Sequence, residues 1–188
     1  MTMNDTMKSG GLANGWRIAA WSAVAALIAT PWVAMQFTKE VRWTLFDFGL
    51  FGGLLIGSGL VLEFVTWKSG SVAYRAAVGL ALLASVLLVL VTGAVGIIGS
   101  EANPANLMYA GVLLVVIGGA VMARLKPAGM ARAMGAAALA QVAIMIIALV
   151  GDLGAEGSAW PRDLIGVTVI FAALWLASAG LFRKAAEA

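Results

Sequence analysis

Apolar residues run along this chain in six continuous stretches, and a short polar segment separates each stretch from the next. A helix needs about twenty apolar residues to cross the roughly 30 Å hydrocarbon core of a bilayer, and each stretch has about this length. The alternating pattern of a transmembrane strand is absent from the sequence. Because lipid offers the backbone no hydrogen-bond partners, continuous stretches of this kind indicate helices. We therefore predict an all-α polytopic membrane protein with six transmembrane helices, over residues 16–35, 45–65, 74–98, 105–124, 131–150 and 162–182.

The composition leaves little room for any other kind of domain. Of 188 residues, 62% are apolar and 11% are charged, against about 45–50% and about 25% in soluble proteins. We expect residues 1–15 to form a flexible cytoplasmic tail and residues 16–184 to form a single transmembrane domain. The stretch 16–35 is long for a signal peptide and its end, 33–35, is a poor cleavage site. We interpret it as a retained helix rather than a cleaved signal.

Positive charges lie unevenly on the two sides of this topology. An even number of helices places both termini on one side, and nine of the 12 Lys and Arg residues fall there. The nine are Lys8, Arg17, Lys68, Arg75, Arg124, Lys126, Arg132, Arg183 and Lys184. The remaining three are Lys39, Arg42 and Arg162. The positive-inside rule therefore predicts that both termini are cytoplasmic.

The six helices also pair into three similar hairpins. The hairpins cover about 16–68, 74–126 and 131–184. Arg17, Arg75 and Arg132 open the odd-numbered helices and lie 58 and 57 positions apart. A triplicated hairpin explains this spacing and implies repeats about an axis along the membrane normal. Positive-inside topology across a bilayer of fixed thickness explains it equally, so both explanations stand.

Missing residue types exclude several kinds of chemistry. The chain has no Cys and no His, which rules out disulfides, thiolate nucleophiles, histidine general bases and imidazole ligation of zinc or haem. No nucleotide-binding loop, nucleophile elbow or metal motif is present. We therefore expect no catalytic residue, no metal site and no cofactor. No predicted helix carries a basic stripe, so we expect no nucleic-acid partner.

Four polar residues inside the apolar stretches are candidates for a transport pathway or polar pocket: Glu63, Gln141, Ser58 and Ser85. Glu63 is the only carboxylate well inside a stretch, and an intramembrane ionisable group suggests a proton or cation site. It lies five residues before Lys68, about 7.5 Å along a helix. Glu63 therefore also fits a structural role, either reaching the interface or pairing with a nearby Arg or Lys. For the other three, hydrogen bonds between helices are the more common role.

Three further polar residues stand at the starts of even-numbered helices: Asp47, Asn106 and Asp163. They suggest a polar ring at the outer side of the membrane, but helix capping is the simpler interpretation. Thr44-x-x-Asp47 has the spacing of a capping box. Asn103-Pro104-x-Asn106 places a capping residue before a proline at the first helical position.

The second stretch carries glycines four residues apart, at Gly49, Gly53 and Gly57. Small residues at this spacing let a second helix approach closely. The stripe predicts a helix-packing interface, either within the bundle or between protomers.

Three segments have a familiar sequence: Ala73–Gly79, Gly96–Tyr109, which includes Gly99-Ser100-Glu101-Ala102-Asn103-Pro104, and Gly129–Ala133. They resemble a group of small, uncharacterised bacterial multi-pass membrane proteins. The resemblance implies a bacterial inner-membrane protein. The group has no assigned activity, so it carries no functional residue onto this chain.

Together these observations predict an integral inner-membrane protein that is not an enzyme. We expect it to act within the lipid bilayer through helix packing, with a second copy or with a membrane-protein partner. The alternative is a small oligomeric transporter or channel that uses the intramembrane carboxylate Glu63.

Overall fold

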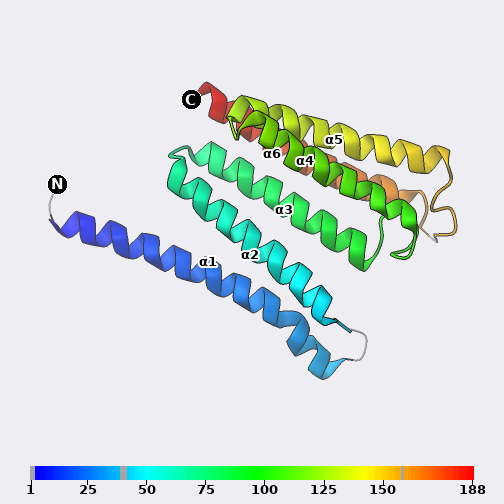
Figure 1. Cartoon of the computed structure of the whole chain (residues 1–188), viewed down its shortest axis with the longest axis horizontal. Helices are drawn as coiled ribbons and strands as arrows, with labels where there is room; N and C mark the ends of the chain where they lie inside the picture. The colour runs from blue at the N-terminus through cyan, green and yellow to red at the C-terminus, as the bar shows by residue number, and fades with distance from the viewer. Residues whose placement is uncertain (1–2, 39–41, 158) are drawn as a thin grey trace. The chain divides into compact units, whose positions relative to one another are not determined.

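The computed structural model describes residues 3–38, 42–157 and 159–188, and these residues form helices joined by short loops (Figure 1). The elements are α1 (Met3–Phe37), α2 (Leu45–Lys68), α3 (Val72–Ala94), the 3₁₀ helix η1 (Pro104–Leu107), α4 (Met108–Ala123), α5 (Pro127–Val150) and α6 (Arg162–Glu187). Six helical segments are long and apolar enough to cross a membrane. This confirms the predicted fold class, an all-α multi-pass membrane protein.

The chain divides into two compact units. The N-terminal unit, Met1–Glu63, holds α1 and most of α2, and the C-terminal unit, Phe64–Ala188, holds the last turn of α2 and all later helices. The boundary falls inside the range 16–184, for which the sequence predicts a single domain.

The C-terminal unit is a helical bundle in which α6 has the central place. Helix α6 packs against both α3 and α5, α5 also packs against α4, and α3 and α4 barely touch each other. The hairpins α3–α4 and α5–α6 therefore differ in packing, although the sequence suggests that they are repeats. Large side chains of α6 fill the centre, where Trp175, Phe182 and Leu164 are fully buried.

Small residues let α4 and α5 approach closely. A Cβ atom added at Gly119 would lie 2.5 Å from the Cβ of Ala133, and one added at Gly129 would lie 2.6 Å from the Cβ of Ala123. The buried face of α5 repeats this choice with alanines such as Ala137. Since lipid tails are as apolar as the helices, van der Waals contact between closely packed backbones holds such a bundle together.

In the N-terminal unit α1 crosses a different pair of glycines from those of the predicted stripe. The ring of Trp21 would lie 3.2 Å from a Cβ at Gly59, and Ile28 would lie 3.8 Å from a Cβ at Gly52. The start of α2 is the predicted capping box. Asp47 Oδ2 accepts from the Thr44 backbone N–H at 2.7 Å, and the Asp47 N–H donates back to Thr44 Oγ1 at 3.3 Å.

The loop after α3 begins earlier than the apolar pattern predicts. Helix α3 ends at Ala94 rather than at Ile98. Gly96 and Gly99 take φ values of 77° and 73°, in the left-handed region, and a Cβ at Gly96 would meet the Ser100 carbonyl carbon at 2.3 Å. Two glycines that the turn requires thus end the helix, and Ile97 and Ile98 are buried in the loop instead of facing lipid.

Helix α4 covers Met108–Ala123 rather than 105–124, because the 3₁₀ helix η1 takes the place of its first turn. Helices α1, α2, α5 and α6 begin earlier or end later than predicted. Helix α1 begins at Met3 and so covers most of the segment 1–15 for which the sequence predicts a flexible tail. No proline interrupts it before Pro31, and extending a helix is much easier than starting one. Helix α5 begins at Pro127 rather than at residue 131, with proline in the first turn. Helix α6 continues to Glu187.

Candidate functional site

The intramembrane carboxylate Glu63 forms an ion pair within the N-terminal unit. Arg17 Nε donates to Glu63 Oε1 at 2.9 Å and Arg17 Nη2 donates to Glu63 Oε2 at 3.1 Å. Trp21 Nε1 donates to the same Oε1 at 2.9 Å. Pairing with a nearby cation is one of the structural roles predicted for Glu63, and the structure shows this pairing.

This arrangement fits a structural role for Glu63, in which its side chain connects α1 and α2. A two-pronged Arg–carboxylate contact is among the stronger and more directional side-chain interactions. It also reduces the cost of holding a charge near the hydrocarbon region. A proton or cation carrier needs a carboxylate that is free to exchange its partner, whereas both oxygens of Glu63 are engaged here.

The four residues predicted to form a polar pocket do not all belong to the same unit. Ser58 lies in the N-terminal unit with Glu63, whereas Ser85 and Gln141 lie in the C-terminal unit. The Ser85 hydroxyl donates to Ala81 O of its own helix at 2.8 Å. Gln141 is fully buried on α5. The structure therefore gives Ser85 a local structural bond, and Gln141 remains a candidate of its own.

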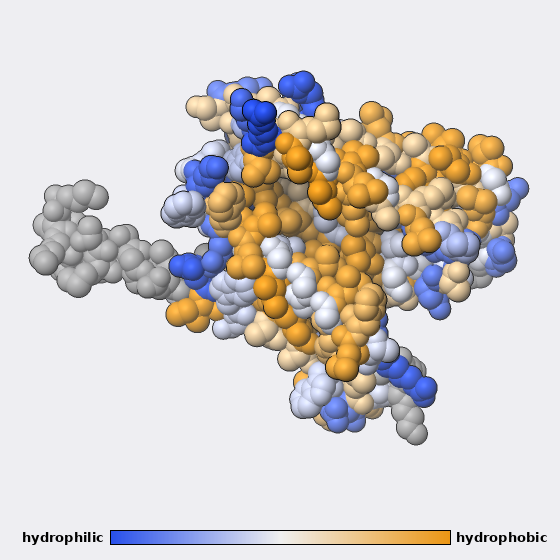
Figure 2. Space-filling view, in the orientation of Figure 1, coloured by the Kyte–Doolittle hydropathy of each residue, from blue (hydrophilic) through white to orange (hydrophobic). Residues whose placement is uncertain are grey.

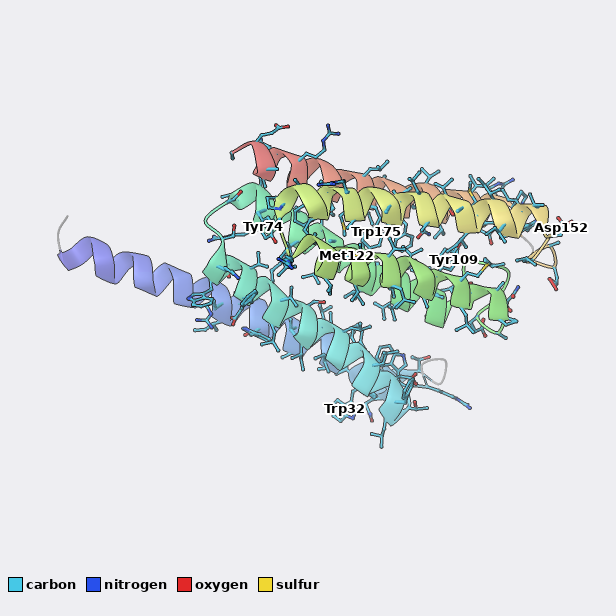
Figure 3. The ribbon with its side chains drawn as sticks, turned by 45° about the horizontal axis from the view of Figure 1, so that its top comes forward. Trp32, Tyr74, Tyr109, Met122, Asp152 and Trp175 are labelled. Carbon is cyan, nitrogen blue, oxygen red and sulfur yellow. The ribbon has the colours of Figure 1, made fainter. Side chains whose placement is uncertain are left out.

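Gln141 belongs to a set of buried polar groups that the sequence does not predict as a set. Both amide atoms of Gln141 are buried and find no hydrogen-bond partner among the described residues. The same holds for Thr92 Oγ1, Tyr109 Oη, Thr168 Oγ1 and Trp175 Nε1. Figure 3 labels Tyr109 on α4 and Trp175 on α6.

Two members of this set approach each other across the bundle. The Tyr109 hydroxyl of α4 lies near the Thr168 hydroxyl of α6, without a hydrogen bond of normal geometry. A buried polar group without a partner costs about 1–3 kcal/mol. The core of the C-terminal unit therefore holds unused hydrogen-bonding capacity spread over α3, α4, α5 and α6. A single buried Gln in an alanine-rich stretch was the one sequence signal for it.

The polar residues at the other helix starts organise loops. Asn106 Oδ1 accepts from the N–H groups of Ile97 and Ile98, at 2.9 Å each, and its amide donates to Ser100 O at 2.7 Å. The prediction that Asn106 caps a helix is therefore wrong. Its side chain instead holds the turn after α3 together. It serves there because the turn leaves two buried N–H groups that only a nearby side chain can satisfy.

Asn103 is a helix cap, as predicted, whereas Asp163 is not. Asn103 Oδ1 accepts from the Ala105 N–H at 3.0 Å at the start of η1, and its amide donates to Leu153 O. Asp163 is the second residue of α6, and its Oδ1 accepts only from the N–H of the next residue, Leu164, at 2.9 Å, while no side chain caps this helix.

The predicted glycine stripe lies open on α2. A Cβ atom added at Gly49, Gly53 or Gly57 meets no atom of the N-terminal unit within 4 Å. Gly49 and Gly53 are exposed. The stripe is therefore free to contact a surface outside this unit.

Apolar side chains are abundant on the molecular surface. In Figure 2, orange apolar side chains cover much of the visible face. Among the described residues, no group of three or more Asp, Glu, His or Cys side chains is placed to hold a metal ion.

Comparison with protein-family models, with curated proteins and with solved structures found no match for this chain.

Proposed function

We propose that this chain is a non-enzymatic, multi-pass protein of the bacterial inner membrane that associates with a second copy of itself through the glycine stripe of α2. The observation that carries the proposal is the open space over Gly49, Gly53 and Gly57. Neighbouring glycines on α2, Gly52 and Gly59, are already used by α1.

An unused glycine stripe on a helix surface needs a physical reason. Each glycine costs a helix about 1 kcal/mol relative to alanine. Three glycines four residues apart repay this cost where a second helix comes close enough for backbone-to-backbone contact. The stripe is its own complement about a twofold axis, which favours a second copy over an unrelated partner.

The charge distribution of the C-terminal unit supports the cytoplasmic placement of its basic end. The end where α3 and α5 begin and α4 and α6 end carries Lys68, Arg75, Arg124, Lys126, Arg132, Arg183 and Lys184. The loops at the other end carry Glu101, Asp152 and Glu156. Figure 3 shows Tyr74 at the first end and Asp152 at the second. By the positive-inside rule the basic end faces the cytoplasm.

Orientation is tested by adding single cysteines to a chain that has none. Cysteine at Glu187 is expected to react with a membrane-impermeant maleimide only after the cells are opened, and cysteine at Glu156 is expected to react in intact cells. The reverse pattern would place the basic end outside.

Self-association is tested with two leucine substitutions at comparable glycines. Gly53→Leu fills the open stripe, whereas Gly166→Leu fills another exposed position on α6 where an added Cβ also meets nothing within 4 Å. We expect wild type and Gly166→Leu to be oligomeric in mild detergent and Gly53→Leu to be monomeric, by light scattering. A monomeric wild type, an unchanged Gly53→Leu assembly, or a stoichiometric second protein in native mass spectra would contradict the proposal.

A second candidate function is passage of small polar solutes through the C-terminal unit. It is supported by the unpartnered amide of Gln141 and by the hydroxyls of Tyr109 and Thr168 in the same core. The test is solute flux into proteoliposomes. If this function holds, Gln141→Leu abolishes flux of a solute such as glycerol, while Glu63→Gln, in the N-terminal unit, leaves the flux unchanged. Flux equal to that of protein-free vesicles would exclude it.

A further inference from the structure

A cavity of about 260 Å³ opens at the basic end of the C-terminal unit. Its wall is formed by the last turn of α2, the start of α3, the turn between α4 and α5, and the end of α6. Lys68 and Arg124 line it, and no carboxylate is among its lining residues. The electrostatic character of the cavity is therefore that of an anion site.

Helix capping does not account for the two cations. The carbonyl groups at the end of α2 are already bonded by Arg75, whose Nε donates to Ser69 O at 2.7 Å and whose Nη2 donates to Thr66 O at 2.8 Å. Lys68 Nζ lies 5.5 Å from the ring centroid of Phe64, and both Lys68 and Arg124 are exposed. Their charged groups are thus free to face a bound anion.

The turn that carries Arg124 is held in an unusual backbone conformation. Arg124 and Leu125 both adopt left-handed φ values, 50° and 58°, a region that residues other than glycine rarely occupy. Tyr74 holds the turn through its hydroxyl, which donates to Leu125 O at 2.7 Å. This conformation keeps Arg124 at the wall of the cavity.

Hydroxyl groups add hydrogen-bond donors to the cavity. The Ser71 hydroxyl accepts from the Tyr74 N–H, and the Ser69 hydroxyl accepts from the Ser71 N–H, so each O–H remains able to donate to an anion in the cavity. Helix α3 and helix α5 begin at this cavity, whereas α2, α4 and α6 end there. Because helix C-terminal ends carry partial negative charge, the helix dipoles add no net positive field, and the charge of the cavity comes from Lys68 and Arg124.

The same cavity also offers apolar walls. Phe64, Val65, Leu125 and Pro127 line it beside the polar groups, and Phe64 is 45% exposed. A soluble phosphate ion has no apolar group that could contact these walls. A phospholipid does, because its acyl chains lie directly below its phosphate. Basic pockets between helices at the cytoplasmic side of a membrane suit anionic lipid headgroups.

The geometry points to a binding site for the phosphate headgroup of an anionic phospholipid in this cavity, with Lys68 and Arg124 as its charged ligands. The site lies within the C-terminal unit and does not depend on self-association through α2.

The test is native mass spectrometry of the full-length protein with phosphatidylglycerol or phosphatidylcholine added in detergent. The test variant is Lys68→Gln with Arg124→Gln. The matched control is Arg132→Gln with Lys184→Gln, which removes the same charge from the same end but not from the cavity wall. We expect phosphatidylglycerol retention to fall about fivefold for each charge removed from the cavity. The control is expected to change retention less than twofold.

Three outcomes would overturn the site: equal retention by the test variant and wild type, an equal loss in the control pair, or equal binding of phosphatidylcholine. An excess of inorganic phosphate distinguishes the two sources of the anion. If phosphate alone displaces phosphatidylglycerol, the lipid assignment is wrong. The exposed positions of both residues predict that the variants fold, and the single variants repeat the test if the double variant gives too little protein.

Discussion

None of the residues in the most apolar window of α1 is buried, whereas 39% of those in the corresponding window of α5 are buried. Both segments are nevertheless long and apolar enough to cross a membrane. Hydropathy indicates whether a helix is stable in lipid, but it does not indicate which other helix it packs against. The N-terminal unit joins its helices through Arg17, Glu63 and two glycine contacts, while the C-terminal unit joins its helices through a continuous core.

The comparison shows what small residues do in each unit. In the C-terminal unit, Gly119 and Ala133 sit in a contact that admits no extra atom. In the N-terminal unit, the glycines of the stripe face open space. The same residue type therefore closes an internal contact in one unit and leaves a surface available in the other.

The largest effect is expected from filling the closed contact. Gly119→Leu forces α4 away from Ala133, and overpacking of this kind costs about 1–3 kcal/mol of stability. Thermal unfolding in detergent should show a clear fall in the midpoint. The control is the adjacent Gly118→Leu, where an added Cβ meets nothing within 4 Å. Equal behaviour of the two variants would mean that the α4–α5 contact is not close-packed.

An intermediate effect, confined to the N-terminal unit, is expected from breaking the ion pair. Glu63→Gln removes the charge that holds Arg17 and Trp21. Spin labels on cysteines placed at Ile18 and Val61, both exposed, should report a broader distance distribution between α1 and α2. Amide exchange in α5 should not change.

A double variant shows whether the pair acts as a unit. If Arg17→Met is combined with Glu63→Gln, the broadening should be no greater than in the worse single variant, because residues in one interaction are not additive. Additive broadening, or faster exchange in α5, would contradict the separation of the two units.

The smallest effect is expected from one bond between α6 and α3. Ser178 Oγ donates to Ala77 O at 2.8 Å in the core, and interhelical bonds of this type average about 0.6 kcal/mol. Ser178→Ala should lower stability by about this amount. Ser85→Ala, which removes a bond within α3 only, should have less effect. A larger loss at Ser85 than at Ser178 would reverse the roles assigned to the two hydroxyls.

The sequence predicts well what depends on neighbours along the chain. The six spans follow from continuous apolar stretches, and the capping bonds of Thr44, Asp47 and Asn103 follow from spacings of a few residues. The pairing of Glu63 with a cation was predicted, but Arg17 lies 46 residues away, so only the fold identifies it.

The contacts between helices across the bundle could not be predicted from the sequence. Tyr109, Thr168 and Trp175 stand in stretches that are apolar on every face, so periodicity does not distinguish a buried side from a lipid-facing side. The early end of α3 depends on left-handed glycines that read, in sequence, as further small residues of an apolar stretch. For the same reason the sequence did not separate the open glycines of α2 from those under α1.

Cysteine cross-linking in native membranes tests the open glycine stripe most directly, because the natural chain has no cysteine. A disulfide requires Cα atoms within about 7 Å of each other, a distance that only a closely packed helix pair provides. We predict that Gly53→Cys gives a covalent dimer on mild oxidation and that Gly166→Cys does not. Cross-linking of Gly53→Cys no greater than that of Gly166→Cys would contradict self-association through α2.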